Sequence, residues 1–407
     1  MRVWLITSLR LRGDPKLRAS GIQNVLTAAA LAEQGHEVTL WVREMDGRGR
    51  CGLERFLGCR LPHRLHLFAG AVAGRAGEKQ TPFSTWGRTL WNLVRVRLLA
   101  GSPDLVVSRS PLLLAQLRRS PFFARRTRLV LEFQYPEWAL LWRSWRRKRP
   151  EASFGDARRE LKRLMESERR WFDAADGVLY AALSHKPLLR RMGFQKPAAH
   201  FPSGCLTPDQ AQEGKTPDFD LGYVGSVAPE NGIQTLFEAL ACLEGVSLIV
   251  VGDGSASYRA SLETLIKRLE IQERVHWVGR VPFCETRKFM RRCRVGVVPI
   301  SARCGPEKRQ WSSPLKLAEW MAAGVPVVAS AVASIRTQVE DNENALLFEP
   351  DDAASLAETL RHLLADPALG TSLAKKGLEQ ARRLSYPNRA RLLTDFCERR
   401  LGEKAGS

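Results

Sequence analysis

The regular alternation of short apolar runs with helical segments constrains the fold of this chain more than any other feature. In the first half the apolar runs cover residues 3–7, 37–42, 104–108, 128–133 and 177–182, and in the second half 221–227, 246–252, 274–279, 294–300, 325–330 and 345–350. Helical periodicity marks residues 21–34 and 156–172, and residues 353–383 are expected to be wholly helical. This alternation is typical of α/β folds with parallel sheets built from βαβ units.

The length of the chain and one aperiodic segment indicate two such domains. The 407 residues suit two domains of roughly 200 residues each, and residues 203–220 are polar and rich in Pro and Gly, as linkers are. We expect a Rossmann-like domain over residues 1–204, a linker over 205–220, a second Rossmann-like domain over 221–380 and a C-terminal helix over 381–407 that returns to the first domain. Doubly wound sheets bind ligands at the carboxyl ends of their strands, here facing a cleft between the domains.

The positive charge of the chain is confined to its first half. Residues 1–200 contain 37 Lys and Arg against 17 Asp and Glu, whereas residues 201–407 contain 26 of each, so the net charge of +20 belongs to the first half. The two halves are therefore expected to face different partners. No segment reaches the roughly 18 apolar residues that a membrane-spanning helix needs.

The segment 311–330, WSSPLKLAEWMAAGVPVVAS, predicts an anion site at a helix N-terminus. Ser312 or Ser313 is expected to cap the helix, with Pro314 at its first position. Lys316 then lies in the first turn, where the helix dipole disfavours a cation unless a bound anion reverses the balance. Glu319 lies on the same face, and ribose hydroxyl groups are suitable donors for it. The alternative is an ordinary surface Lys–Glu pair.

This segment resembles the donor-site motif of family-4 glycosyltransferases, which is written SPLKLxEYMAAGxPVVAS. The resemblance continues in the same order through residues 223–240, 248–255, 275–282, 295–301 and 343–360, and more loosely through 31–42 and 175–204. It implies the GT-B architecture, in which two Rossmann-like domains face each other across a cleft, and a nucleotide-diphosphate sugar as donor. The helix N-terminus would hold the diphosphate, and the glutamate matching Glu319 would bind the ribose.

The resemblance also assigns site residues. Lys316 and Glu319 are the predicted catalytic residues, and the donor-binding set comprises Gly225, Ser226, Gly252, Asp253, Gly254, Arg280, Ser313, Pro314, Leu315, Lys316 and Glu319. Gly21, Glu132 and Gln134 are predicted to bind the acceptor. Gln134 stands where the family often has a histidine and cannot act as a base, so Glu132 is the substitute; its alternative role is that of a buried polar group on a strand.

Three positions depart from the family pattern. Trp311 replaces the first glutamate of the usual Glu-x7-Glu pair, and Ser226 and Asn231 replace an arginine and a lysine that commonly neutralise the diphosphate. Candidates for the missing charge are the cations Lys316, Arg280, Lys308 and Arg309. These departures leave room for a degenerate, non-catalytic protein.

No metal or cofactor is expected beyond the nucleotide-sugar co-substrate, which would be linked to UDP or GDP. Asp218-Phe219-Asp220 matches the DxD metal motif of the other large glycosyltransferase fold, but it lies in the linker ahead of a strand. We interpret the match as incidental. The histidines show no ligand spacing.

The basic first half contains a tryptophan stripe that predicts contact with an anionic membrane surface. Trp138, Trp142 and Trp145 share one helical face and are followed by Arg146, Arg147, Lys148 and Arg149. Indoles prefer the headgroup region, and nearby cations bind anionic lipid. Residues 83–99 form a second segment of this type. The alternative is a stripe packed into the domain core, and nucleic acid is not expected as a partner because no binding motif for it is present.

Together these features predict a cytoplasmic glycosyltransferase, peripheral on the cytoplasmic face of the membrane. It would transfer a sugar from its nucleotide donor to a lipid-linked or cell-envelope glycan acceptor. A GT-B epimerase or hydrolase and a degenerate membrane-associated protein are the alternatives.

Overall fold

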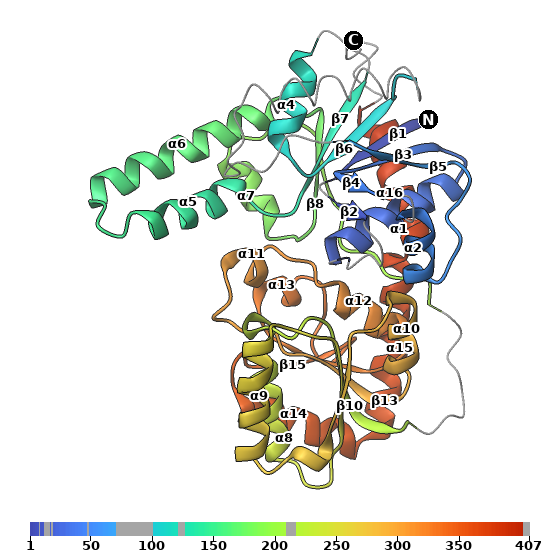
Figure 1. Ribbon diagram of the computed structural model, residues 1–407, viewed down its shortest axis with the longest axis vertical. Helices are drawn as coiled ribbons and strands as arrows, with labels where there is room; N and C mark the ends of the chain where they lie inside the picture. The colour runs from blue at the N-terminus through green and yellow to red at the C-terminus, as the bar shows by residue number, and fades with distance from the viewer. Residues whose placement is uncertain are drawn as a thin grey trace. The chain divides into compact units, whose positions relative to one another are not determined.

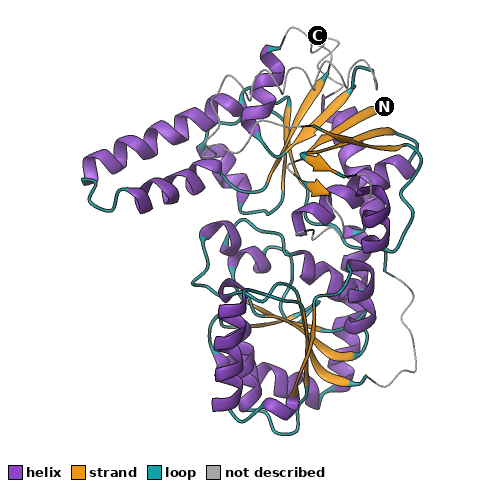
Figure 2. Ribbon diagram, in the orientation of Figure 1, coloured by secondary structure: helices purple, strands orange, loops and turns teal. Residues whose placement is uncertain are grey.

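The computed structural model describes residues 1–7, 9–11, 17, 19–46, 49–70, 101–120, 127–208 and 217–401. The chain forms two compact units. Unit 1 comprises residues 1–55, 59–202 and 389–407, and unit 2 comprises 56–58 and 203–388. In each unit a parallel sheet lies between layers of helices (Figures 1 and 2), so the α/β architecture with two Rossmann-like domains is confirmed.

Unit 1 is built on a seven-stranded parallel sheet with the order β5-β3-β1-β6-β7-β8-β9. The strands are β1 (Arg2–Ile6), β3 (Glu37–Val42), β5 (Leu65–Ala69), β6 (Leu105–Ser108), β7 (Arg128–Phe133), β8 (Gly177–Tyr180) and β9 (Ala198–His200). A separate two-stranded sheet joins β2 (Arg10–Leu11) and β4 (Glu44–Met45). The helices are α1 (Ala19–Glu33), α2 (Gly49–Leu57), α4 (Pro111–Arg119), α5 (Glu137–Lys148), α6 (Phe154–Phe172) and α7 (His185–Arg191).

Unit 2 contains a six-stranded parallel sheet with the order β12-β11-β10-β13-β14-β15. Its strands are β10 (Phe219–Val224), β11 (Leu248–Val251), β12 (Val275–Gly279), β13 (Cys293–Val298), β14 (Val327–Ser330) and β15 (Leu346–Phe348). Its helices are α8 (Ile233–Ala241), α9 (Ala256–Arg268), α10 (Phe283–Met290), α11 (Pro306–Arg309), α12 (Leu315–Ala322), α13 (Ala333–Arg336), α14 (Ala353–Ala365) and α15 (Pro367–Leu384). The strand order reverses beside β10, and such a switch point is where doubly wound sheets bind ligands.

Residues 353–383, expected to be wholly helical, are helical except at Asp366, which divides the segment into two helices. The first helix ends at Ala365, and the second starts at Pro367. Asp366 caps this second helix by accepting from the backbone N–H of Leu369 at 2.9 Å. A proline at the first helical position lacks the N–H that would continue the preceding helix, so the Asp-Pro pair divides the segment.

The C-terminal segment groups with unit 1 from Arg389 onward. Arg389 lies at the start of this segment in α16 (Tyr386–Asp395) and is 3% exposed. Its guanidinium lies 3.5 Å from the centre of the Phe201 ring and donates to the Phe201 carbonyl oxygen and to Thr27.

Within the described part of the chain, no helix combines the length and apolar character needed to cross a bilayer.

Candidate donor site

Three glycine turns meet at the carboxyl ends of β10, β11 and β12. Gly225 and Gly252 have φ values of 146° and 144°, which residues with side chains rarely adopt. The Gly252 N–H donates to the Gly279 carbonyl at 2.7 Å, and a Cβ at Gly252 would lie 1.8 Å from the Gly225 oxygen. A Cβ at Gly254 would lie 2.0 Å from the carbonyl oxygen of Val227. Gly252 and Gly254 of the predicted donor set therefore pack against neighbouring backbone, where no side chain fits.

Lys316 lies beside these turns. Its Nζ is 4.8 Å from the centre of the Tyr223 ring and donates to the Tyr223 hydroxyl at 3.4 Å. A Cβ at Gly225 would be only 3.3 Å from this ammonium group. Loss of solvation, followed by repulsion from Lys308, lowers the pKa of Lys316 to about 7. The lysine is thus held where an anion would favour its charged form.

Asn231 connects Lys316 to two other positions of the donor region. Its side chain is 2% exposed and donates to the hydroxyl group of Ser226 at 2.8 Å and to the Ser226 carbonyl at 2.6 Å. Its Oδ1 accepts from Lys308 at 2.6 Å and from Lys316 at 3.4 Å. Ser226 and Lys316, both predicted from sequence, are therefore joined through a residue that the donor set omitted.

The start of α12 differs from the prediction. The helix begins at Leu315, Pro314 occupies the N-cap, and no side chain caps it. The Ser313 hydroxyl instead donates to Gln338 at 2.8 Å and accepts from the backbone N–H of Ser203 at 2.9 Å. The prediction that Ser312 or Ser313 caps the helix is therefore wrong. The Ser313 hydroxyl bonds to residues distant in the sequence, and the Ser312 hydroxyl donates to the Lys308 carbonyl oxygen.

Glu319 lies in a buried network. One carboxylate oxygen accepts from the Leu206 N–H at 2.9 Å, and the other lies 3.4 Å from the Arg287 guanidinium. Glu319 is 3% exposed, and burial raises its pKa to about 7 against the opposing effect of Arg287. Its ribose contact stays a prediction. Arg287 was missed because no local spacing relates it to Glu319, 32 residues away.

The other donor positions lie closer to solvent. Asp253 is exposed and accepts from the Gly254 N–H at 2.8 Å, and Arg280 is also exposed. Trp311 is 9% exposed, so a large apolar side chain fills the position of the family's first glutamate. Asp218 pairs with Arg292, and Asp220 pairs with Arg294 at 3.0 Å and accepts from Ser247. Within the described residues, no cluster of three or more metal-ligating side chains is present.

The predicted acceptor residues lie in unit 1. Gly21 is buried in α1, where a Cβ would meet the Leu9 side chain at 2.7 Å. Glu132 is 5% exposed and accepts from Gln134 at 3.0 Å. It also accepts from Arg109 at 2.8 Å and from Arg389 at 2.7 Å. Burial alone would raise the pKa of Glu132, but the two guanidinium groups lower it below its usual value. This geometry holds Glu132 as a charged, structurally engaged carboxylate, and a general base would need a freer one.

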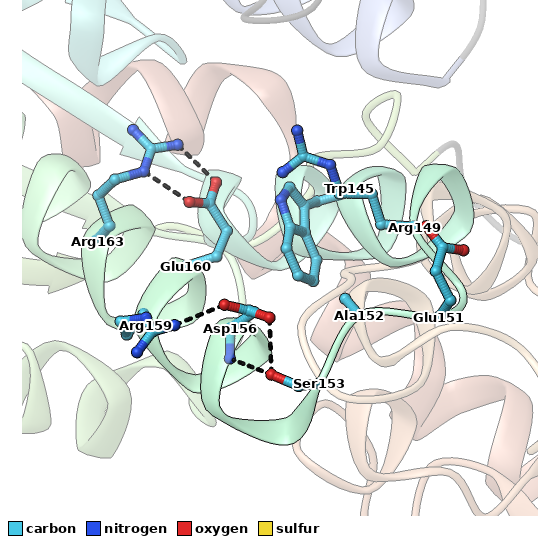
Figure 3. A pocket seen from close by; sticks show the side chains of 9 residues that line it. All are labelled: Trp145, Arg149, Glu151, Ala152, Ser153, Asp156, Arg159, Glu160 and Arg163. Carbon is cyan, nitrogen blue, oxygen red and sulfur yellow. Dashed lines mark hydrogen bonds and ion pairs between the residues drawn. The ribbon is translucent and has the colours of Figure 1, made fainter.

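The predicted membrane residues lie on a hairpin of α5 and α6, which extends beyond the sheet of unit 1 (Figure 1). α5 has no fully buried residue, and Trp138, Trp142 and Trp145 are half-buried rather than exposed. The Trp142 and Trp145 rings stack 5.4 Å apart. Trp145 and Arg149 line a hollow of about 640 Å³ at the end of the hairpin, facing α6 residues (Figure 3). Arg146, Arg147, Lys148 and Arg149 are exposed, as is Phe154 at 84%.

Two segments predicted from the sequence fall wholly or partly outside the described residues. Residues 83–99, the second candidate membrane segment, lie outside the described residues. Half of the expected linker, residues 209–216 of 205–220, also lies outside them.

Comparison with known proteins gives a family match within the C-terminal half. Residues 218–366 match the family described as "Glycosyl transferases group 1". The lipopolysaccharide core biosynthesis glycosyltransferase LpsE of Rhizobium meliloti is 32% identical over 156 residues, which is 38% of this chain and 42% of that protein. The chain matches less than half the length of the first curated relatives.

Solved structures extend the likeness to the whole fold. Sucrose-phosphate synthase from Thermosynechococcus elongatus superimposes with a TM-score of 0.71 at 22% identity, covering 100% of both chains. HepE of Anabaena, solved with UDP-glucose, gives a TM-score of 0.67 at 17% identity, covering 97% of this chain and 98% of that one. Residues 218–366 thus match the group 1 glycosyl transferases, in a chain whose two Rossmann-like domains have the fold of the GT-B glycosyltransferases.

Proposed function

We propose that this protein transfers a sugar from a nucleoside-diphosphate sugar, with UDP as the first candidate nucleotide, to a lipid-linked or cell-envelope glycan. The observation that carries the proposal is the position of Lys316. It lies within the segment that matches the group 1 glycosyl transferases, against the Gly225 turn at the carboxyl end of β10. An ammonium group with a lowered pKa beside backbone that tolerates no side chain suits a diphosphate.

The chemistry follows from where charge develops. As the bond between the anomeric carbon and the diphosphate oxygen breaks, the electron pair stays on the diphosphate. Lys316 would stabilise that charge, and such preorganised stabilisation is often the largest catalytic effect. The acceptor hydroxyl oxygen forms the new bond with the anomeric carbon, and its proton passes to water or to an oxygen of the departing diphosphate. Glu319 would bind the ribose. In this proposal side chains, not a metal ion, neutralise the negative charge of the diphosphate.

Relatives support the class of donor and acceptor. HepE was solved with UDP-glucose, and LpsE is described as acting in lipopolysaccharide core biosynthesis. An acceptor of this kind lies at a membrane, and the exposed cations of α5 with Phe154 at the hairpin end would hold the protein on the cytoplasmic, anionic face.

Nucleotide binding tests the proposal. UDP, GDP and ADP are titrated into the wild type and Lys316→Ala by calorimetry, with EDTA present. The wild type should bind one nucleotide saturably, and Lys316→Ala should bind it about 10- to 100-fold more weakly, as expected for a lost charge-assisted contact. Labelled UDP-sugars then reveal the reaction: release of UDP without acceptor would indicate a hydrolase or an epimerase. Failure of all three nucleotides to bind the wild type would remove the proposed function.

A further inference from the structure

Two lysines from different segments converge on one amide oxygen in unit 2. Asn231 Oδ1 accepts from Lys308 at 2.6 Å and from Lys316 at 3.4 Å. The amide is fixed in this orientation, because its nitrogen donates to the Ser226 hydroxyl and carbonyl oxygens. Asn231 is 2% exposed, so the oxygen is presented from a rigid, buried position. The two ammonium groups therefore have a defined separation.

This arrangement is electrostatically costly without an anion. Like charges repel, and the repulsion grows where the surroundings exclude water. The carboxylate of Glu230 lies 4.0 Å from Lys308, and its side chain is 50% exposed, so this ion pair contributes little. Tyr223 contributes its hydroxyl group and ring face to Lys316. A group with two negative charges would turn the repulsion into attraction.

The chain holds Lys308 in place through the segment between β13 and α12. The Ser312 hydroxyl donates to the Lys308 carbonyl at 2.6 Å, and Arg309 donates to the Ala302 carbonyl at 3.0 Å. The Ala302 N–H in turn donates to Asp351 at 3.0 Å. The short α11 is thus anchored on both sides of Lys308, and the lysine is directed toward the turn after β10.

We propose that Lys308 and Lys316 together clamp the diphosphate of the donor, and that Asn231 is the positioning residue that sets their spacing. This inference rests on the proposed function. Lys308 lies on a four-residue helix outside the motif around Lys316, and it brings a second cation to the turn where Ser226 and Asn231 themselves are neutral. A nucleoside diphosphate, with charge on both phosphates, fits two cations better than a nucleoside or a monophosphate.

Comparison of ligands separates the clamp from a merely structural contact. In Lys308→Met we expect the dissociation constant for UDP to rise about 10- to 100-fold, as for a lost charged contact, while that for uridine stays unchanged. Lys288→Met, an exposed lysine on α10, is the matched control and should leave both constants unchanged. If Lys308→Met weakens uridine and UDP equally, the lysine is structural and the clamp is wrong.

Dependence on pH gives a second readout. Lys308 lowers the pKa of Lys316 by repulsion, after the larger effect of burial, while Glu230 raises it. Wild-type affinity for UDP should fall as the pH rises above about 7 and Lys316 loses its proton. In Lys308→Met this decline should begin at a higher pH, because the repulsion is gone. An unchanged profile would contradict coupling between the two lysines.

Moving the charge tests the geometry. Asn231→Lys combined with Lys308→Met places an ammonium group from position 231 near the site that Lys308 Nζ occupied, and should recover most of the lost UDP affinity. If Lys308→Met binds UDP like the wild type, the clamp is overturned while the proposed function stands. If the wild type itself does not bind UDP, GDP or ADP, the proposed function fails first.

Discussion

The backbone of Gly252 approaches the next turn so closely that any side chain there would displace it. Gly252→Ala combines a strained φ of 144° with a Cβ only 1.8 Å from the Gly225 oxygen. We expect the free energy of unfolding to fall by roughly 2–6 kcal/mol, with a large loss of UDP affinity because the turn beside Lys316 moves. Chemical denaturation and calorimetry measure the two effects.

Gly245→Ala is the matched control for this substitution. Gly245 also has a positive φ, 66°, but nothing lies within 4 Å of the added Cβ. It should therefore show only the cost of the left-handed backbone, about 1–2 kcal/mol, with unchanged UDP affinity. Equal effects of the two variants would show that backbone conformation alone, not the contact with Gly225, limits position 252.

Individual residues were predictable from sequence where a local motif specifies them. Lys316 and the glycines at 225, 252 and 254 belong to strand-to-turn or turn-to-helix patterns, whose geometry is set within a few residues. The links through Asn231 to Lys308 and through Glu319 to Arg287 join segments 77 and 32 residues apart. Lys308 was among the candidate cations, but only the folded sheet brings these segments together, so sequence spacing gave no signal for the contacts themselves.

At the scale of elements, α5 depends on its neighbour for its first turn. Pro136 at the N-cap makes no side-chain hydrogen bond. Instead Glu168 of α6 accepts from the backbone N–H groups of Glu137 at 2.9 Å and Trp138 at 2.8 Å. Glu168 is 1% exposed, and burial raises its pKa from 4.5 to about 7, although the two N–H groups oppose the shift.

This geometry predicts a pH-dependent contribution from Glu168. The folded chain holds the proton more tightly than the unfolded chain, so the stabilising contribution is complete below pH 4.5 and is lost as the pH rises through about 7. Relative to Glu168→Gln, the wild type should lose about 3 kcal/mol of unfolding free energy between pH 4.5 and pH 8. Denaturant titrations at several pH values measure the difference, with Glu166→Gln, exposed on the same helix, as the matched control. If the stability difference between the wild type and Glu168→Gln does not depend on pH, the predicted contribution of Glu168 is wrong.

The sequence predicted the strands well and the ends of the helices less well. The apolar runs at 128–133 and 37–42 coincide with β7 and β3, because a strand buried on both faces needs a continuous apolar run. The division at Asp366 and the uncapped start of α12 were missed. Helix ends depend on single capping contacts, and at α12 the expected serine bonds to Gln338 instead.

On the scale of the whole molecule, charge is divided between the two halves of the sequence, and this division determines how the protein would meet a membrane. The excess of 20 positive charges lies within residues 1–200. Residues 146–149 concentrate four of these charges in one exposed stretch, next to Phe154, which is 84% exposed. Each cation near an anionic leaflet contributes about 1 kcal/mol, and an exposed aromatic ring suits the interface.

Vesicle flotation of the full chain tests this docking surface. The wild type should float with vesicles that contain anionic lipid but not with neutral ones, and less well at high salt, because ions screen exposed charges. Neutralising Arg146, Arg147, Lys148 and Arg149 should weaken binding by roughly 4 kcal/mol, about a thousandfold. The matched control neutralises Lys267, Arg268, Lys288 and Lys375, four exposed cations of unit 2, and changes the net charge equally. Equal loss of flotation in both variants would mean that total charge, not the hairpin of α5 and α6, drives membrane binding. Unchanged flotation in both variants would exclude this surface, independently of what the donor site binds.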